Sequence, residues 1–126
     1  MTTNHKLENA KKALFQFEDF CKAKSPSKLE IAGVIQGFEF TLEVFWKLFK
    51  YLAEQKGYQI DSPRSSLSAA LSMGLIENEQ TWVKMLKDRN ETSHIYNEIV
   101  AQGIYSRAVK EYLIEFQHSM KRVDKL

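Results

Sequence analysis

The chain contains one cysteine, two prolines and five glycines in 126 residues, and each scarcity excludes a class of protein. With Cys21 alone, no internal disulfide can form and no zinc site can be built on cysteines. The glycines are scattered, so the sequence has no glycine-rich phosphate loop. His94 has no second histidine at the spacing that a metal site requires. We therefore expect neither a bound metal nor a cofactor.

The chain also has little net charge and no long apolar run. Its 18 Lys and Arg against 16 Asp and Glu give a formal charge of +2, which argues against a strongly basic coat protein but not against a local basic patch. No apolar run reaches about 18 residues free of charge, so we expect no membrane span. The first residues, MTTNHKLENAKK, are unlike a signal peptide, and these features together predict a cytoplasmic protein.

Length and hydrophobic content fit one domain over residues 1–126. Hydrophobic spacing predicts helices only, in an all-α, up-and-down antiparallel bundle of four longer helices and one short one. We expect helices over residues 6–23, 28–56, 63–73, 78–89 and 97–123. Their predicted inward side chains are Leu7, Ala10, Leu14, Phe17 and Cys21, widened by Phe15 and Phe20; Leu67, Ala70 and Leu71; Trp82, Met85 and Leu86; and Ile99, Ile104, Tyr105, Ala108, Tyr112, Leu113 and Phe116.

Helix boundaries follow from local signals. Pro26 should force Ser25 out of the helical region, and Ser27 with Glu30 forms a potential capping box for the second helix. The third helix should begin with an N-cap serine followed by proline, and Asn97 should cap the last helix. We expect a glycine to end the second and third helices in the C′ position, namely Gly57 and Gly74.

The predicted second helix is apolar on nearly every side, so we expect it to be central, covered by neighbours or by neighbours and a second subunit. Gly33 and Gly37 are costly in a helix interior and should allow another backbone to come close. Glu39 and Glu43 lie four residues apart on this helix. They form either a solvated stripe or ion pairs, with Arg89 as the expected partner of one of them.

The stretch from Arg89 to Tyr96, RNETSHIY, lies where the fourth helix should fray and the last begin. Arginine is a fixed cation whose planar fork fits a phosphate, and histidine exchanges protons near neutral pH. Arg89 and His94 could therefore bind and cleave a phosphodiester without a metal. The alternative is that the histidine only caps a helix or packs in the core.

In its context this stretch resembles a known family. Arg89-x4-His94-x-Tyr96, with Asn90 after the arginine, resembles the R-x4-6-H signature of HEPN domains. It is most similar to the HepT-like proteins and nucleotidyltransferase substrate-binding proteins encoded beside minimal nucleotidyltransferases. The similarity covers residues 7–118. It is supported by the segments VIQGFEFTLEVFWK at residues 34–47, SPR at 62–64 and MLKDRN at 85–90.

The resemblance implies a homodimer whose two motifs face one another across a cleft, acting as a metal-independent ribonuclease toxin. Arg89 would hold the scissile phosphate, and His94 would transfer protons. Asn90 would help orient the phosphate or the histidine. A cognate minimal nucleotidyltransferase would be the antitoxin and would add AMP to Tyr96. Glu39 and Glu43 are expected to support the site.

Two other functions stay open. The bundle could be a non-catalytic subunit that presents a groove for a nucleotide or substrate to the nucleotidyltransferase, with Tyr96 as acceptor or stacking surface. It could also be a structural dimer in which Arg89 only forms an ion pair with Glu39 or Glu43. For cleavage, RNA supplies its own 2′-hydroxyl nucleophile, and the protein must supply a proton acceptor, a proton donor and a cation. One chain has no second acid near the motif, because His5 and His118 lie near its ends, so nuclease activity requires a dimer.

Overall fold

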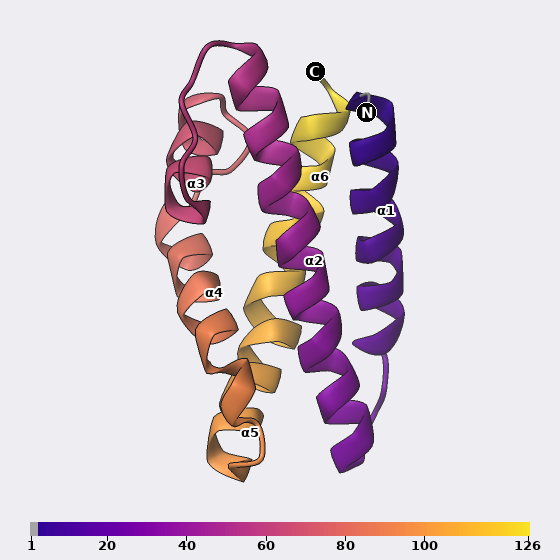
Figure 1. Ribbon diagram of the computed structural model, residues 1–126. Coiled ribbons are helices and arrows are strands. Elements are labelled where there is room, and N and C mark those ends of the chain that lie inside the picture. The colour runs from indigo at the N-terminus through magenta and orange to yellow at the C-terminus, as the bar shows by residue number, and fades with distance from the viewer. Residues whose placement is uncertain (1–2) are drawn as a thin grey trace.

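The computed structural model describes the fold of residues 3–126 and side chains from His5 onward. This part of the chain contains helices and no strand, which confirms the all-α prediction (Figure 1). Both ends of the chain lie at the same end of an up-and-down bundle (Figure 1). The elements are α1 (Thr3–Phe20), α2 (Lys28–Gln55), α3 (Pro63–Ser72), α4 (Glu79–Glu91), a 3-10 turn (Thr92–His94), α5 (Glu98–Arg107), a π-turn (Ala108–Tyr112) and α6 (Leu113–Asp124).

The caps at the helix starts are those that the sequence predicts. The Ser27 hydroxyl accepts the amide of Glu30 at 3.1 Å, and the Glu30 carboxylate accepts the amide of Ser27 at 2.9 Å. Ser62 caps α3 with Pro63 as its first residue, and the Asn97 side chain caps α5. The cap of α4 was not predicted as such: Asn78, which with Glu77 was a candidate for the start of this helix, caps it, and the helix begins at Glu79.

Two glycines end helices in the left-handed conformation, as predicted. Gly57 has a φ of 91° and Gly74 a φ of 76°, values that side chains disfavour. After α2, the amide of Tyr58 reaches back to the carbonyl of Ala53 at 3.1 Å. After α3, the amide of Leu75 donates to the carbonyl of Ala70 at 2.9 Å. Each chain reversal therefore satisfies carbonyls at a helix end.

The core lies between α2 and the helices on either side of it. α1 packs along one side of α2, α3 packs against its C-terminal half, and the α5–α6 segment packs behind it (Figure 1). Aromatic rings fill the centre, and Trp82 meets Phe116 edge to face with ring centroids 5.4 Å apart. The largest fully buried side chains are Trp82, Tyr112, Phe17, Phe38, Phe45, Phe49, Phe116, Ile35, Leu42, Leu48, Leu67 and Leu75.

Several side chains predicted to face inward are exposed. Phe15 is 74% exposed, Ile99 is 85% exposed, and Phe20 and Leu71 are 37% and 39% exposed. Phe40 on α2 is 54% exposed. These positions follow helical spacing, but neighbouring elements among the described residues cover them only in part, as at Phe20 and Leu71, or hardly at all, as at Phe15 and Ile99. The prediction of their burial is wrong for a single chain.

Two glycines expected to admit a neighbouring backbone behave differently. A Cβ atom at Gly33 would meet nothing within 4 Å, so the prediction is wrong there. At Gly37 a Cβ atom would lie 3.2 Å from the Phe17 ring and 3.1 Å from the Phe20 ring. Gly37 therefore makes room for two aromatic side chains of α1, not for a backbone.

Several helix boundaries also differ from the prediction. α1 begins at Thr3, three residues before its predicted start, and α4 continues to Glu91, two residues past its predicted end. α1 ends at Phe20, three residues early, because a tighter turn follows in which Lys22 bonds to Asp19 and Ser25 has a φ of 49°. The last predicted helix is divided by the π-turn, in which the amide of Leu113 bonds to the carbonyl of Ala108. This i to i+5 bond inserts an extra residue into the helical turn.

Candidate functional site

Arg89 lies in the last turn of α4, where the helix meets α2. Its guanidinium lies 3.4 Å from a carboxylate oxygen of Glu43, and 27% of its side chain is exposed. This confirms the predicted pairing of Arg89 with one of the two glutamates. The contact is long for a charged hydrogen bond, and the guanidinium remains accessible to an anion from solvent.

Glu39 and Glu43 of α2 each have a partner. Glu43 also accepts the indole N–H of Trp46 at 3.1 Å and lies 3.7 Å from the Lys47 ammonium group. Glu39 accepts the hydroxyl of Thr92 at 2.7 Å. The same Thr92 hydroxyl lies 2.8 Å from the carbonyl oxygen of Arg89. The start of the 3-10 turn is thus fixed to α2 through Glu39.

His94 and Tyr96 form a second pair, beyond the end of α4. The Tyr96 hydroxyl lies 3.5 Å from Nδ1 of His94, and their ring centroids are 6.0 Å apart at an interplanar angle of 74°. Both side chains are exposed, Tyr96 by 81%. His94 is therefore neither a buried core residue nor excluded from solvent.

The structure therefore brings the motif residues together as two pairs. Arg89 contacts Glu43, and His94 contacts Tyr96, with no bond between the pairs in the described residues. Asn90 is exposed, and its side chain forms no hydrogen bond within residues 5–126.

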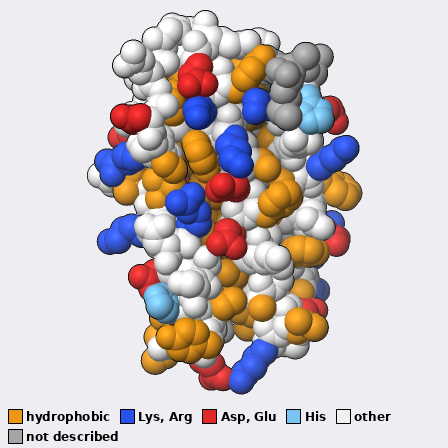
Figure 2. All heavy atoms as spheres, viewed as in Figure 1, with side chains coloured by type: hydrophobic (Ala, Val, Ile, Leu, Met, Phe, Trp, Pro, Cys, Tyr) orange, Lys and Arg blue, Asp and Glu red, His pale blue; other side chains and the backbone are white. Residues whose placement is uncertain are grey.

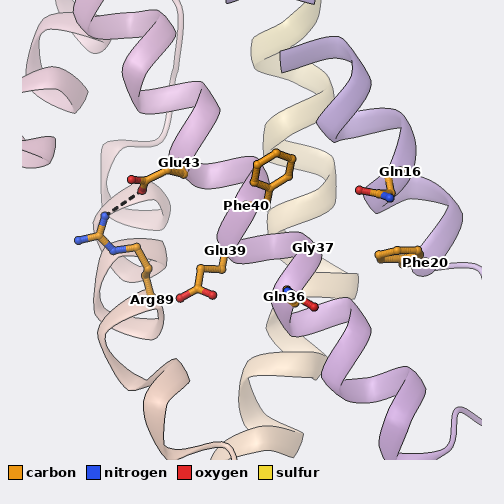
Figure 3. Close-up of a pocket in the computed structure, with 8 residues that line it drawn as sticks. All are labelled: Gln16, Phe20, Gln36, Gly37, Glu39, Phe40, Glu43 and Arg89. Carbon is orange, nitrogen blue, oxygen red and sulfur yellow. Dashed lines mark hydrogen bonds and ion pairs between the residues drawn. The ribbon is translucent and has the colours of Figure 1, made fainter. Parts of the chain in front are cut away.

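A hollow of about 740 Å³ lies beside Arg89 (Figure 3). Arg89, Glu39 and Glu43 lie on one side of it, and Phe40 and Phe20 on the other (Figure 3). Gln16, Gln36 and Gly37 complete its lining, so the hollow spans α1, α2 and α4. On this face hydrophobic side chains are open to solvent among charges of both signs (Figure 2).

A smaller hollow of about 310 Å³ lies beside Tyr96, between the start of α2 and α5. Its apolar lining includes Ile31, Ile35 and Ile95. Lys28 and Glu98 also line it and lie 2.5 Å apart as an exposed ion pair. This pairing raises the pKa of Lys28 and lowers the pKa of Glu98, chiefly through their hydrogen bond.

Sequence reasoning missed a buried cluster directly beside Arg89. Asp88 is 7% exposed, and its Oδ2 accepts Nε of Arg107 at 2.6 Å and the hydroxyl of Tyr112 at 2.5 Å. Its Oδ1 accepts a second guanidinium nitrogen of Arg107 at 2.8 Å. Burial, together with the bond to Asp88, raises the pKa of Tyr112, so the phenol remains a donor. The bond to Asp88 raises the pKa of Arg107.

A sequence signal for this cluster existed. Trp82, Met85 and Asp88 are spaced by three residues on α4, so Asp88 occupies a position on the buried face. A carboxylate in such a position requires donors from another element. The donors could not be named from the sequence, because Arg107 and Tyr112 share a face only through the π-turn.

The described residues contain neither a group of metal ligands nor a helix that could span a membrane. No group of three or more His, Cys, Asp or Glu side chains there is arranged to hold a metal ion. None of the helices in that part of the chain is both long enough and apolar enough to cross a membrane.

Comparison with known proteins identifies the family. Residues 5–125 match the family described as nucleotidyltransferase substrate binding protein like. The chain belongs to this family. The predicted resemblance is thereby confirmed.

Individual relatives agree with this membership. A curated relative from Haemophilus influenzae, named probable ribonuclease HepT, is 36% identical over 90 residues. That match covers 68% of this chain and 61% of the relative, so it spans less than two thirds of the relative's length.

Two solved structures share the fold. A protein from Thermus thermophilus matches with a TM-score of 0.82 and 32% identity, covering 90% of this chain and 98% of that chain. HI0074 from Haemophilus influenzae, described as having the fold of a substrate-binding domain of a nucleotidyltransferase, matches with a TM-score of 0.71 and 27% identity. This second match covers 97% of this chain and 96% of that chain.

Proposed function

We propose that the protein is a metal-independent ribonuclease of a toxin–antitoxin pair, with Arg89 and His94 as its catalytic residues. The observation that carries the proposal is the solvent-exposed His94, five residues beyond a guanidinium that retains only one long contact, to Glu43. The similarity to a probable ribonuclease HepT supports it.

The chemistry requires no metal. The 2′-oxygen of RNA attacks the adjacent phosphorus while its proton passes to one neutral imidazole. The bond from phosphorus to the 5′-oxygen breaks, and a protonated imidazole donates to the leaving oxygen. A cyclic phosphate and a 5′-hydroxyl result. Arg89 exchanges Glu43 for the phosphate and stabilises its developing negative charge. Asn90, exposed beside Arg89, would orient the phosphate or the imidazole.

Two imidazoles require two chains, so we propose a homodimer. Besides His94, the chain has His5 on α1 and His118 on α6, far along the chain from the motif. The hollow beside Arg89 also carries Phe20 and Phe40, which are exposed aromatic side chains at its edge. A second copy packed on this face would bury both rings and bring its own motif toward Arg89.

RNA cleavage in the presence of EDTA tests this function. Wild-type protein should cleave a labelled RNA, and His94→Ala should lower the rate at least a hundredfold, the usual contribution of a general acid or base. His118→Ala is the matched control, since it removes an exposed histidine from α6, and it should leave the rate unchanged. Equal cleavage by wild type and His94→Ala would remove His94 from the mechanism.

A second function is favoured by the exposure of Tyr96. With 81% of its side chain accessible and His94 beside its hydroxyl, Tyr96 could accept AMP from ATP in a reaction catalysed by a cognate minimal nucleotidyltransferase. The phenol oxygen bonds to the α-phosphorus, its proton is released, and pyrophosphate leaves. The family name and the similarity to HI0074 support a partner of this kind. In this role the protein is the substrate-binding subunit.

AMP transfer can be measured directly. The protein is incubated with ATP, magnesium and a cognate minimal nucleotidyltransferase, and the intact mass is recorded. Tyr96→Phe should abolish the mass gain of one AMP, whereas Tyr58→Phe, at another exposed tyrosine, should not. If Tyr96→Phe gains AMP at the same site as wild type, the tyrosine assignment is wrong.

A further inference from the structure

A charged contact with a nearly buried carboxylate lies directly beside Arg89 in the chain. Asp88 occupies the buried face of α4, where a carboxylate is unfavourable unless every oxygen is satisfied. Both oxygens are satisfied by three short bonds, and all three donors come from the α5–α6 segment. We call the group formed by Asp88, Arg107 and Tyr112 the Asp88 cluster.

The π-turn makes the Asp88 cluster possible. Arg107 and Tyr112 are five residues apart, and in a regular α-helix that spacing separates two side chains by about 140° around the axis. They could not both reach one carboxylate. The π-turn at Ala108–Tyr112 adds a residue to the turn and brings both donors to the side that faces α4. π-turns of this kind occur frequently at functional sites.

The Asp88 cluster holds the end of α4 to the α5–α6 segment, and Thr92 holds it to α2. Successive side chains of an α-helix are about 100° apart, so directing Asp88 toward α5–α6 leaves Arg89 directed toward α2. There it meets Glu43. Thr92 bonds Glu39 of α2 and the carbonyl of Arg89, so the segment that carries Arg89 is held to α5–α6 through residue 88 and to α2 through residue 92.

We propose that Asp88 is a positioning residue: together with Arg107 and Tyr112 it sets the direction of the Arg89 side chain and the start of the turn that carries His94. Stability alone does not require such a cluster, because buried ion pairs can be replaced by apolar side chains of similar size without loss. A carboxylate held in a fork by arginine instead specifies one orientation. Because the catalytic consequence rests on the proposed ribonuclease function, the experiment has a second, structural readout.

The test replaces the Asp88 cluster by an apolar one, Asp88→Leu, Arg107→Met and Tyr112→Phe together. The control is Lys84→Met with Glu111→Leu, which removes the ion pair at 3.1 Å between α4 and the π-turn. This pair links the same elements but is exposed, and it lies one helical turn before Asp88. Folding is checked by circular dichroism and urea unfolding. The readouts are kcat and KM for RNA cleavage, and the NMR signals of the Arg89 side chain and the His94 ring.

We expect the triple variant to fold, to lose at least tenfold in kcat with KM changed less than threefold, and to show shifted or broadened Arg89 and His94 signals. The control should retain wild-type kcat and signals. If the triple variant does not fold, Arg107→Lys is tested instead. This variant keeps the positive charge but loses the planar pair of donors that binds both oxygens of Asp88. We expect it to lower kcat three- to tenfold. Unchanged Arg89 and His94 signals in a folded variant would overturn the proposal. If wild type cleaves no RNA, the ribonuclease function fails, and the signals alone decide the role of Asp88.

Discussion

Tyr112 shows how a single buried residue links stability to pH. It is fully buried, and burial together with its bond to Asp88 raises its pKa. Above pH 10 the unfolded chain loses the phenolic proton while the folded chain keeps it. Unfolding then releases a proton, so the free energy of unfolding decreases as pH rises, by up to about 1.4 kcal/mol per pH unit for one group.

We predict that wild type loses stability above pH 10 more steeply than Tyr112→Phe, although this variant is less stable near neutral pH. The measurement is urea unfolding between pH 8 and 11, with Tyr58→Phe as a control at an exposed tyrosine. If the free energy of unfolding falls with pH equally in wild type and Tyr112→Phe, the Tyr112 phenol is not protected from ionisation.

Helix boundaries could be predicted from the sequence because the signals that set them are local. Ser27 with Glu30, Ser62 with Pro63, and Gly57 each act within a few residues, and each is found in its predicted role. The π-turn could not be predicted, because it depends on Arg107 and Tyr112 both bonding to Asp88, which lies on another helix. Burial was predicted less well than helix position, since spacing at Phe15 or Ile99 does not reveal whether another element covers the stripe.

The candidate site, too, could be predicted from the sequence only in part. The pairing of Arg89 with a glutamate of α2 followed from the cost of an unpaired charge on a buried helix, and Glu43 is that partner. The contact of Thr92 with Glu39 depends on the path of the chain after α4. It could not be derived from the sequence, since it requires the 3-10 turn.

Two glycines on α2 give a matched test at the level of the helix. Gly33→Ala should stabilise the protein by about 0.5–1 kcal/mol, because alanine favours the helix and nothing lies within 4 Å of the new Cβ atom. At Gly37 the new atom would lie 3.2 Å from the fully buried ring of Phe17, which cannot move freely. Gly37→Ala should therefore be less stable than Gly33→Ala by about 1 kcal/mol or more. The check is urea unfolding of both variants, and equal stabilities would contradict the packing described for α1 on α2.

For the whole molecule, the exposed aromatic side chains beside Arg89 form the surface on which we propose that a second copy binds. Phe40→Ser should weaken a homodimer at least tenfold in Kd, because burial of such a ring contributes about 1.5–3 kcal/mol. Leu71→Ser, at an exposed position on α3, should leave Kd unchanged. Sedimentation equilibrium measures both. A wild-type protein that remains monomeric at micromolar concentration would contradict the dimer, and an unchanged Kd in Phe40→Ser would place the interface on another face.

The central claim is that two chains each contribute His94 to one ribonuclease centre. The most direct measurement mixes wild type with His94→Ala at constant total concentration, allows the subunits to exchange, and follows RNA cleavage in EDTA. If both imidazoles are needed, mixed dimers are inactive and the rate falls as the square of the wild-type fraction. A rate that falls in proportion to the wild-type fraction would contradict a shared centre.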